Sequence, residues 1–301
     1  MLLSLLTSAA FAQEPVSAIP RHRLYYESLA ALRYNPLGLQ ERFTVGYRLR
    51  LFDKPADDLL LSDSYIWVGA TGLQTPAFMR AGPWVRVMPL ALLRFQAGYE
   101  LVQYHGGFDQ MLVWGAREVT DYSPDGMEAL AAQGTTRAKG SILTLETRVQ
   151  AKAGPVAVRA TVGRYQFRYD VDGVAFYDQT LDILAPTDGA VWSTDVDLLY
   201  VASDKLTAGV RSTHTRSGAE MVDNANLAST RRASIDRAGP LVAYQFKADV
   251  GSRFATPTLY TICQWHIDHE YRTGQEVSRA IPYFAVGFAF TGDGVAWEPQ
   301  G

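Results

Sequence analysis

The stretch Arg42-Phe43-Thr44-Val45-Gly46-Tyr47-Arg48-Leu49-Arg50-Leu51-Phe52 decides the fold class of this chain of 301 residues. Apolar side chains occupy every second position from Phe43 to Leu51, and arginine, threonine and glycine lie between them. Successive side chains of a β-strand point to opposite faces. The alternation therefore predicts a strand with one apolar and one polar face.

The same period of two residues recurs along most of the chain. Helical periodicity is confined to a short stretch near residues 127–132, so we expect an all-β protein. With residues 42–52, the alternating or strand-like stretches make twelve predicted strands: 24–34, 64–71, 80–87, 93–101, 143–150, 156–163, 192–200, 206–211, 242–249, 259–270 and 283–290.

The connections between these strands have a regular rhythm. The three longest, residues 106–136, 172–189 and 217–234, all fall on one side if both termini lie on the other. Bacterial outer-membrane barrels have an even number of strands, short periplasmic turns and longer outer loops. We therefore predict a single closed antiparallel transmembrane β-barrel of about twelve strands, with ten or fourteen as alternatives, and with both termini in the periplasm.

The N-terminal residues predict export. Residues 1–12 are an uncharged apolar run ending in Ala10-Phe11-Ala12, the pattern of small residues that signal peptidase accepts. We expect a signal peptide at 1–12, a periplasmic segment at 13–20, the barrel at 21–291 and a tail at 292–301.

The export signal, the aromatic-rich alternating strands and the stretch Tyr283-Phe284-Ala285-Val286-Gly287-Phe288-Ala289-Phe290 resemble Gram-negative outer-membrane β-barrel proteins as a class. The resemblance implies an outer-membrane location, contact with membrane lipids and lipopolysaccharide, and recognition by the barrel-insertion machinery. The chain departs from the class at its end, because Gly301 rather than an aromatic residue is last. That leaves the insertion signal internal or supplied by Trp297. No specific family is recognised.

The polar faces of the predicted strands carry many charges. The residues expected to line the lumen are Arg42, Arg48, Arg50, Arg80, Arg86, Arg94, Glu100, Glu146, Arg148, Arg159, Arg211 and Lys247, with Glu27, Arg33, Lys152, Asp249 and Glu270 on the same face. A cationic wall in a narrow aqueous lumen concentrates anions. This favours a narrow, anion-preferring channel for small hydrophilic solutes. The alternative is a closed interior in which arginines and carboxylates pair.

Residues 106–136 form the predicted gate of such a channel, because Met111-Leu112-Val113-Trp114 is too apolar for a solvated loop tip. The segment could fold into the lumen, pack on the rim or form an extra strand pair.

A second group suggests an enzyme. Asp195 and Asp197 share an inward face, and so do His266 and Asp268. The group is similar to the His/Asp site of the omptins, outer-membrane proteases. That likeness implies that His266 acts as the base, Asp268 orients it, and Asp195 and Asp197 polarise water. The strand number and the order of these residues differ from the omptin pattern, and polar lining of the lumen explains the same residues.

Other classes of function find little support. The net charge of −3 predicts no generic attraction to nucleic acid, and Cys263 is alone, so we expect neither a disulfide nor a thiolate metal site. His22, His105 and His214 have no neighbour at metal-ligand spacing. We expect no metal and no cofactor, and we favour a protein that is not an enzyme. A structural or adhesion barrel that transports nothing is the remaining alternative.

Overall fold

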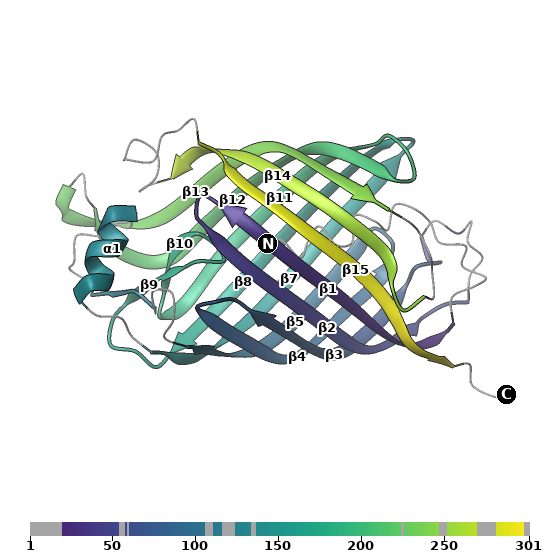
Figure 1. Ribbon diagram of the computed structural model, residues 1–301, viewed down its shortest axis with the longest axis horizontal. Helices are drawn as coiled ribbons and strands as arrows, with labels where there is room; N and C mark the ends of the chain where they lie inside the picture. The colour runs from purple at the N-terminus through teal and green to yellow at the C-terminus, as the bar shows by residue number, and fades with distance from the viewer. Residues whose placement is uncertain are drawn as a thin grey trace.

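The computed structural model describes residues 20–53, 58, 60–105, 111–115, 124–133, 137–223, 226–246, 252–269 and 281–297. These residues form a closed barrel of 12 antiparallel strands, with a small three-stranded sheet and a helix near one end (Figure 1). The predicted all-β class and strand number are confirmed. The predicted signal peptide and nearly all of segment 13–20 lie outside the described residues.

The barrel strands follow one another around the wall in chain order, and the first pairs with the last. They are β1 (His22–Tyr34), β2 (Gly38–Arg50), β3 (Tyr65–Gln74), β4 (Phe78–Leu90), β5 (Leu93–Tyr104), β7 (Lys139–Ala153), β8 (Val156–Tyr169), β11 (Asp188–Val201), β12 (Leu206–Asp223), β13 (Asn226–Gln245), β14 (Ala255–His269) and β15 (Tyr283–Trp297). The small sheet contains β6 (Val113–Trp114), β9 (Ala175–Asp178) and β10 (Ile183–Pro186), and the helix is α1 (Pro124–Gln133).

The alternation in the sequence becomes an apolar outer surface and a polar lumen. Leu32, Tyr99 and Leu198 are exposed on the outside of the barrel, whereas Glu27 and Arg86 are buried inside it. This is the reverse of a water-soluble protein, and lipid is the solvent that such a surface requires. The protein is an outer-membrane β-barrel of the Gram-negative type, and its outer surface contacts membrane lipid. Within the described residues, no helix is long and apolar enough to cross a membrane.

The two ends of the barrel differ as the connections predict. His22 pairs with Trp297, so β1 begins and β15 ends at the same end, which we call the periplasmic end. Short turns at residues 91–92, 154–155 and 202–205 lie there too. The long connections, residues 105–138 and 170–187, lie at the opposite, outer end.

Two strand ends differ from the prediction. Residues 217–234 form no long loop, because β12 continues to Asp223 and β13 begins at Asn226. The outward side chains here include the exposed pair Glu220–Arg232, so this hairpin extends beyond the apolar belt. The last strand also continues past Phe290 to Trp297 and stays paired with β1, with one shift of register between Leu24 and Tyr25.

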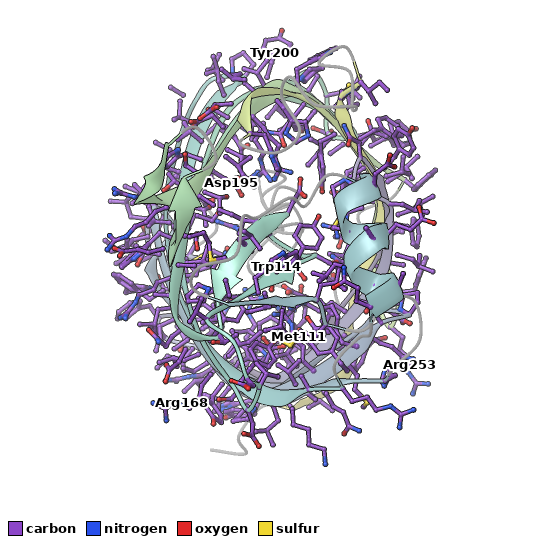
Figure 2. The ribbon with its side chains drawn as sticks, turned by 90° about the vertical axis from the view of Figure 1, so that its left-hand side faces the viewer. Met111, Trp114, Arg168, Asp195, Tyr200 and Arg253 are labelled. Carbon is purple, nitrogen blue, oxygen red and sulfur yellow. The ribbon has the colours of Figure 1, made fainter. Side chains whose placement is uncertain are left out.

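The outer end of the lumen is filled by what we call the plug, residues 111–115 and 174–187 (Figure 2). The hairpin β9–β10 is buried along its whole length, and β6 pairs with β9. Around it, apolar side chains point inward from the outer ends of the barrel strands, among them Phe78, Tyr104, Ile142, Phe167, Val191 and Ile235.

The plug is built from two of the long connections that the sequence predicts. Met111, Leu112 and Trp114 of the predicted gate are buried in this apolar cluster, so that part of the segment folds into the lumen. Residues 172–189, predicted as an outer loop, instead supply the buried hairpin. Residues 106–110, 116–123 and 134–136 of the predicted gate lie outside the described residues.

Candidate functional site

Below the plug, the lumen is crossed by ion pairs in which one carboxylate lies between two arginines. Glu100 on β5 forms ion pairs with Arg42 of β2 and Arg80 of β4, with N–O distances of 3.5 and 3.4 Å to the same oxygen. All three side chains come from strands of the same wall and are at most about one-tenth exposed. The group carries a net positive charge, because two guanidiniums share one carboxylate.

A second group of this kind lies on β8, β11 and β12. Asp197 is 2.5 Å from Nη2 of Arg159 and 2.6 Å from Nε of Arg211, and all three side chains are almost fully buried. Asp195 accepts a hydrogen bond of 2.6 Å from the Thr213 hydroxyl and lies 3.6 Å from Arg211. Both aspartates of the predicted enzyme site are therefore engaged with arginine.

Arg86 lies among aromatic rings nearer the periplasmic end. Its guanidinium is 4.8 Å from the centre of the Trp67 ring and 4.7 Å from that of Trp84. It also donates to both oxygens of Glu27 on β1. Beside this group, Arg94 pairs with Glu146, and Arg148 donates to the Thr161 hydroxyl at 3.2 Å.

Most of the residues predicted to line the lumen do point into it. Those that are buried or half-buried on the inward face are Arg42, Arg48, Arg50, Arg80, Arg86, Arg94, Glu100, Glu146, Arg148, Arg159 and Arg211. Arg48 and Arg50 lie close to the periplasmic rim, where they pair with Asp63 and Asp53. Lys152 is exposed. Lys247, Asp249 and Glu270 lie outside the described residues.

The structure breaks the predicted alternation of His266 and Asp268. In the pairing of β13 with β14, Arg237 lies opposite His266 but Asp236 lies opposite Asp268, so Ile267 is an extra residue in β14. A β-bulge of this kind reverses the facing of the residues that follow it. Asp268 is therefore exposed on the outside, and His269 is buried inside in its place. The predicted pair of His266 with Asp268 does not form on the lumen face.

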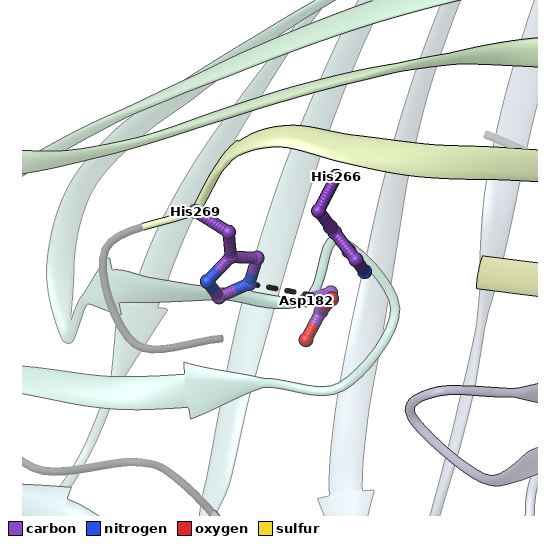
Figure 3. A group of neighbouring side chains, drawn as sticks. All are labelled: Asp182, His266 and His269. Carbon is purple, nitrogen blue, oxygen red and sulfur yellow. Dashed lines mark ion pairs between the residues drawn. The ribbon is translucent and has the colours of Figure 1, made fainter. Parts of the chain in front are cut away.

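The bulge brings His266 and His269 to the same side of β14, where they meet Asp182 from the tip of the plug hairpin (Figure 3). His269 Nε2 lies 3.4 Å from Asp182 Oδ2. The two imidazole rings are perpendicular, with centres 5.1 Å apart. All three residues are buried. Two imidazoles and a carboxylate are ligands that transition metals accept.

Several residues of this interior do not follow from the alternation of the sequence. Asp182 and His269 are among them, because strict alternation hides a bulge and because the length of residues 172–189 predicts an outer loop. The signal for the hairpin was present: Val174-Ala175-Phe176-Tyr177 and Ile183-Leu184-Ala185-Pro186 are apolar on both faces, which suits a buried strand pair. Arg237, whose guanidinium lies 4.3 Å from the centre of the Tyr283 ring, is another. It falls between the predicted loop 217–234 and the predicted strand 242–249.

No protein-family model and no curated protein matches this sequence. Solved structures that resemble the fold include the β domain of the Bordetella autotransporter BrkA, with 11% identity, a TM-score of 0.44 and coverage of 90% of this chain and 99% of that one. OccAB1 of Acinetobacter baumannii has 11% identity and a TM-score of 0.40 over 85% and 67% of the two chains. The Pseudomonas putida toluene transporter TodX has 9% identity and a TM-score of 0.34 over 92% and 91%.

Proposed function

We propose that this barrel is a gated channel for small acidic solutes, with the plug as its gate. The observation that carries the proposal is the surplus of inward arginines over inward carboxylates between the plug and the periplasmic rim. Glu100 and Asp197 each serve two arginines. A positive lumen attracts anions, and the planar guanidinium pairs with carboxylates or phosphates through two hydrogen bonds.

The contrast between the two parts of the lumen supports this function over a purely structural one. At the outer end the barrel fills its interior with apolar side chains such as Phe167, Phe176 and Ile183. Replacing buried ion pairs with apolar residues is often neutral or stabilising. A lumen that only had to be filled could therefore be apolar throughout. Charged side chains below the plug would be hydrated in an open lumen, and so they fit a passage that fills with water when the plug moves.

The plug is held to the wall mainly by apolar contacts, and its polar contacts include the Asp182–His269 pair and a hydrogen bond of 3.4 Å from Arg33 to the Thr180 carbonyl. The Thr187 amide donates to the Val174 carbonyl at 3.0 Å. The two ends of the β9–β10 hairpin are therefore adjacent where they join the rest of the chain. The described part of the predicted gate, with Val113 and Trp114, adds one strand to it. A displacement of this hairpin would uncover the arginines.

Planar bilayer recordings of the purified, folded barrel test the proposal. In one variant, residues 175–186 are replaced by two glycines, which can join Val174 to Thr187 because these residues are already adjacent. We expect rare openings in the natural protein and at least a tenfold larger mean current in the variant. In a gradient of KCl, the reversal potential should show preference for chloride.

Charge variants separate anion preference from mere opening. Arg80→Gln and Arg159→Gln in the shortened barrel should reduce the preference for chloride. Arg216→Gln, on the outward face of β12, is the matched control and should leave it unchanged. A folded, shortened barrel that carries no current would contradict the proposed channel and favour the structural or adhesion alternative. A current that prefers potassium would contradict the proposed preference for anions.

We also infer two partners from the architecture. Lipopolysaccharide would surround the outer end, where the β12–β13 hairpin presents polar outward groups such as His214 and Arg232. The barrel-insertion machinery would handle β15, whose outward face carries Phe284 and Phe288.

A further inference from the structure

Three side chains that bind metals meet where the plug touches the wall. Asp182 lies at the tip of the β9–β10 hairpin, and His266 and His269 lie near the outer end of β14 (Figure 3). One ligand atom from each residue can be chosen so that all three lie within 4.8 Å of one another. We propose that Asp182, His266 and His269 bind a divalent transition-metal ion of the Zn²⁺ class, and that the ion fastens the plug hairpin to the barrel wall.

The donor set fits such an ion. Zn²⁺ binds imidazole nitrogen and carboxylate oxygen at about 2.0–2.2 Å, and three protein ligands leave a fourth position for water. Two ligands of a tetrahedral ion at those bond lengths are about 3.3–3.5 Å apart. His269 Nε2 and Asp182 Oδ2 already have a separation of 3.4 Å. His266 has a ligand atom within 4.8 Å of one from each of the other two residues, and a rotation of its side chain would complete the set.

The backbone is arranged to present these ligands. His266 and His269 are three residues apart on one strand and would face opposite sides without the extra residue Ile267. Bulges commonly re-aim side chains beside functional sites. Asp182 has a left-handed backbone conformation with a φ of 59°, which is uncommon for a residue other than glycine. Both unusual features serve the same three-residue cluster.

Neighbouring groups hold Asp182 in place. The Tyr177 hydroxyl donates to Asp182 Oδ1 at 2.6 Å, which leaves Oδ2 directed toward His269. The Asp182 amide donates to the Asp178 carbonyl at 2.8 Å, and the Asp178 carboxylate accepts from the Leu181 amide at 2.8 Å. Hydrogen bonds of this kind to a ligating carboxylate fix its orientation and tune the affinity of the site for the ion.

The arginine opposite His266 in the strand register has another partner. Arg237 lies opposite His266 in the strand register, but its guanidinium lies over the Tyr283 ring. Asp178, also buried, places a second carboxyl in the same hairpin, four residues before Asp182. The ion would join two parts of the chain that are far apart in sequence, which is how a small cluster can hold a mobile segment.

The test uses the full-length folded barrel in detergent, without a histidine tag and stripped of metal by a chelator. Titration with Zn²⁺ in a calorimeter should show one site per chain. His266→Ala, His269→Ala and Asp182→Asn should each weaken binding at least tenfold. His214→Ala is the matched control. His214 pairs with Asp236 at 2.8 Å on the outer surface of the barrel, so its removal should leave the affinity for Zn²⁺ unchanged.

Two further measurements keep the test decisive if a variant is unstable. Co²⁺ bound to the natural protein should give the strong visible absorption of a four-coordinate site. Zn²⁺ should raise the melting temperature of the natural protein and of His214→Ala, but not that of folded His269→Ala. Absence of binding to the natural protein, or equal loss in His214→Ala, would overturn the proposal. These readings do not depend on conduction, so the site and the channel can fail separately.

Discussion

Arg86 and Glu27 form a two-pronged ion pair across the lumen, with Nη1–Oε1 and Nη2–Oε2 distances of 3.0 and 3.3 Å. They belong to β4 and β1, which are separated in the wall by β2 and β3. The pair therefore spans the curved inside of the barrel and ties non-adjacent strands together, with the Arg86 guanidinium packed against the rings of Trp67 and Trp84.

Removing one partner of this pair should destabilise the barrel. Glu27→Gln leaves the Arg86 charge buried without its carboxylate, and we expect a loss of about 3–5 kcal/mol in the free energy of unfolding. Urea unfolding in lipid vesicles, followed by tryptophan fluorescence, measures it. Glu220→Gln breaks the exposed pair with Arg232 and should cost less than about 1 kcal/mol. Equal losses in the two variants would contradict the special role of the buried pair.

Asp197 and Asp195 should differ in their effect on stability. Asp197→Asn deprives both Arg159 and Arg211 of their close carboxylate, whereas Asp195→Asn weakens a longer contact of 3.6 Å with Arg211. We expect a loss of about 3–5 kcal/mol for the first variant and a clearly smaller loss for the second. The same unfolding measurement ranks them, and the reverse order would show that the shared carboxylate is not the anchor of this group.

The plug should loosen before the barrel does. Phe176→Ala removes a fully buried ring at the centre of the apolar cluster, a change that costs about 3–5 kcal/mol in tightly packed sites. We expect faster hydrogen exchange of the β9–β10 amides, while the wall strands keep their protection. Val174→Ala, at a residue 40% exposed, should change little. Exchange that rises equally throughout the wall would mean that plug and barrel unfold together.

The single cysteine reports on the lipid-facing surface. Cys263 lies between the buried, inward residues Ile262 and Gln264, so its thiol points outward. A nitroxide attached to it should collide more often with oxygen than with a water-soluble nickel chelate. The control is Ser203→Cys in a Cys263→Ala background, because residue 203 is exposed in a periplasmic turn. If the label at Cys263 meets the chelate more often than oxygen, the outward surface of β14 faces water.

The strands could be predicted from sequence because alternation is a local property. Because the apolar residues from Phe43 to Leu51 alternate with threonine, glycine and arginine, only one face can meet lipid, and the same holds along the whole wall. The bulge at Ile267 could not be predicted in this way, because residues 266–269 alone do not show where the pairing with β13 shifts by one residue. The contacts of Asp182 were equally hidden, since they depend on a hairpin folding back into a space that other strands enclose.

The pairing of His22 with Trp297 also has a consequence for biogenesis. Until β15 has been synthesised, β1 and β14 each present an unpaired edge, and such edges are templates for aggregation. Pairing between the two extremes of the barrel is among the most non-local of contacts and is formed slowly. In this wall closure is made by β1 and β15, so the chain has to be kept apart from its own copies until its last strand has arrived.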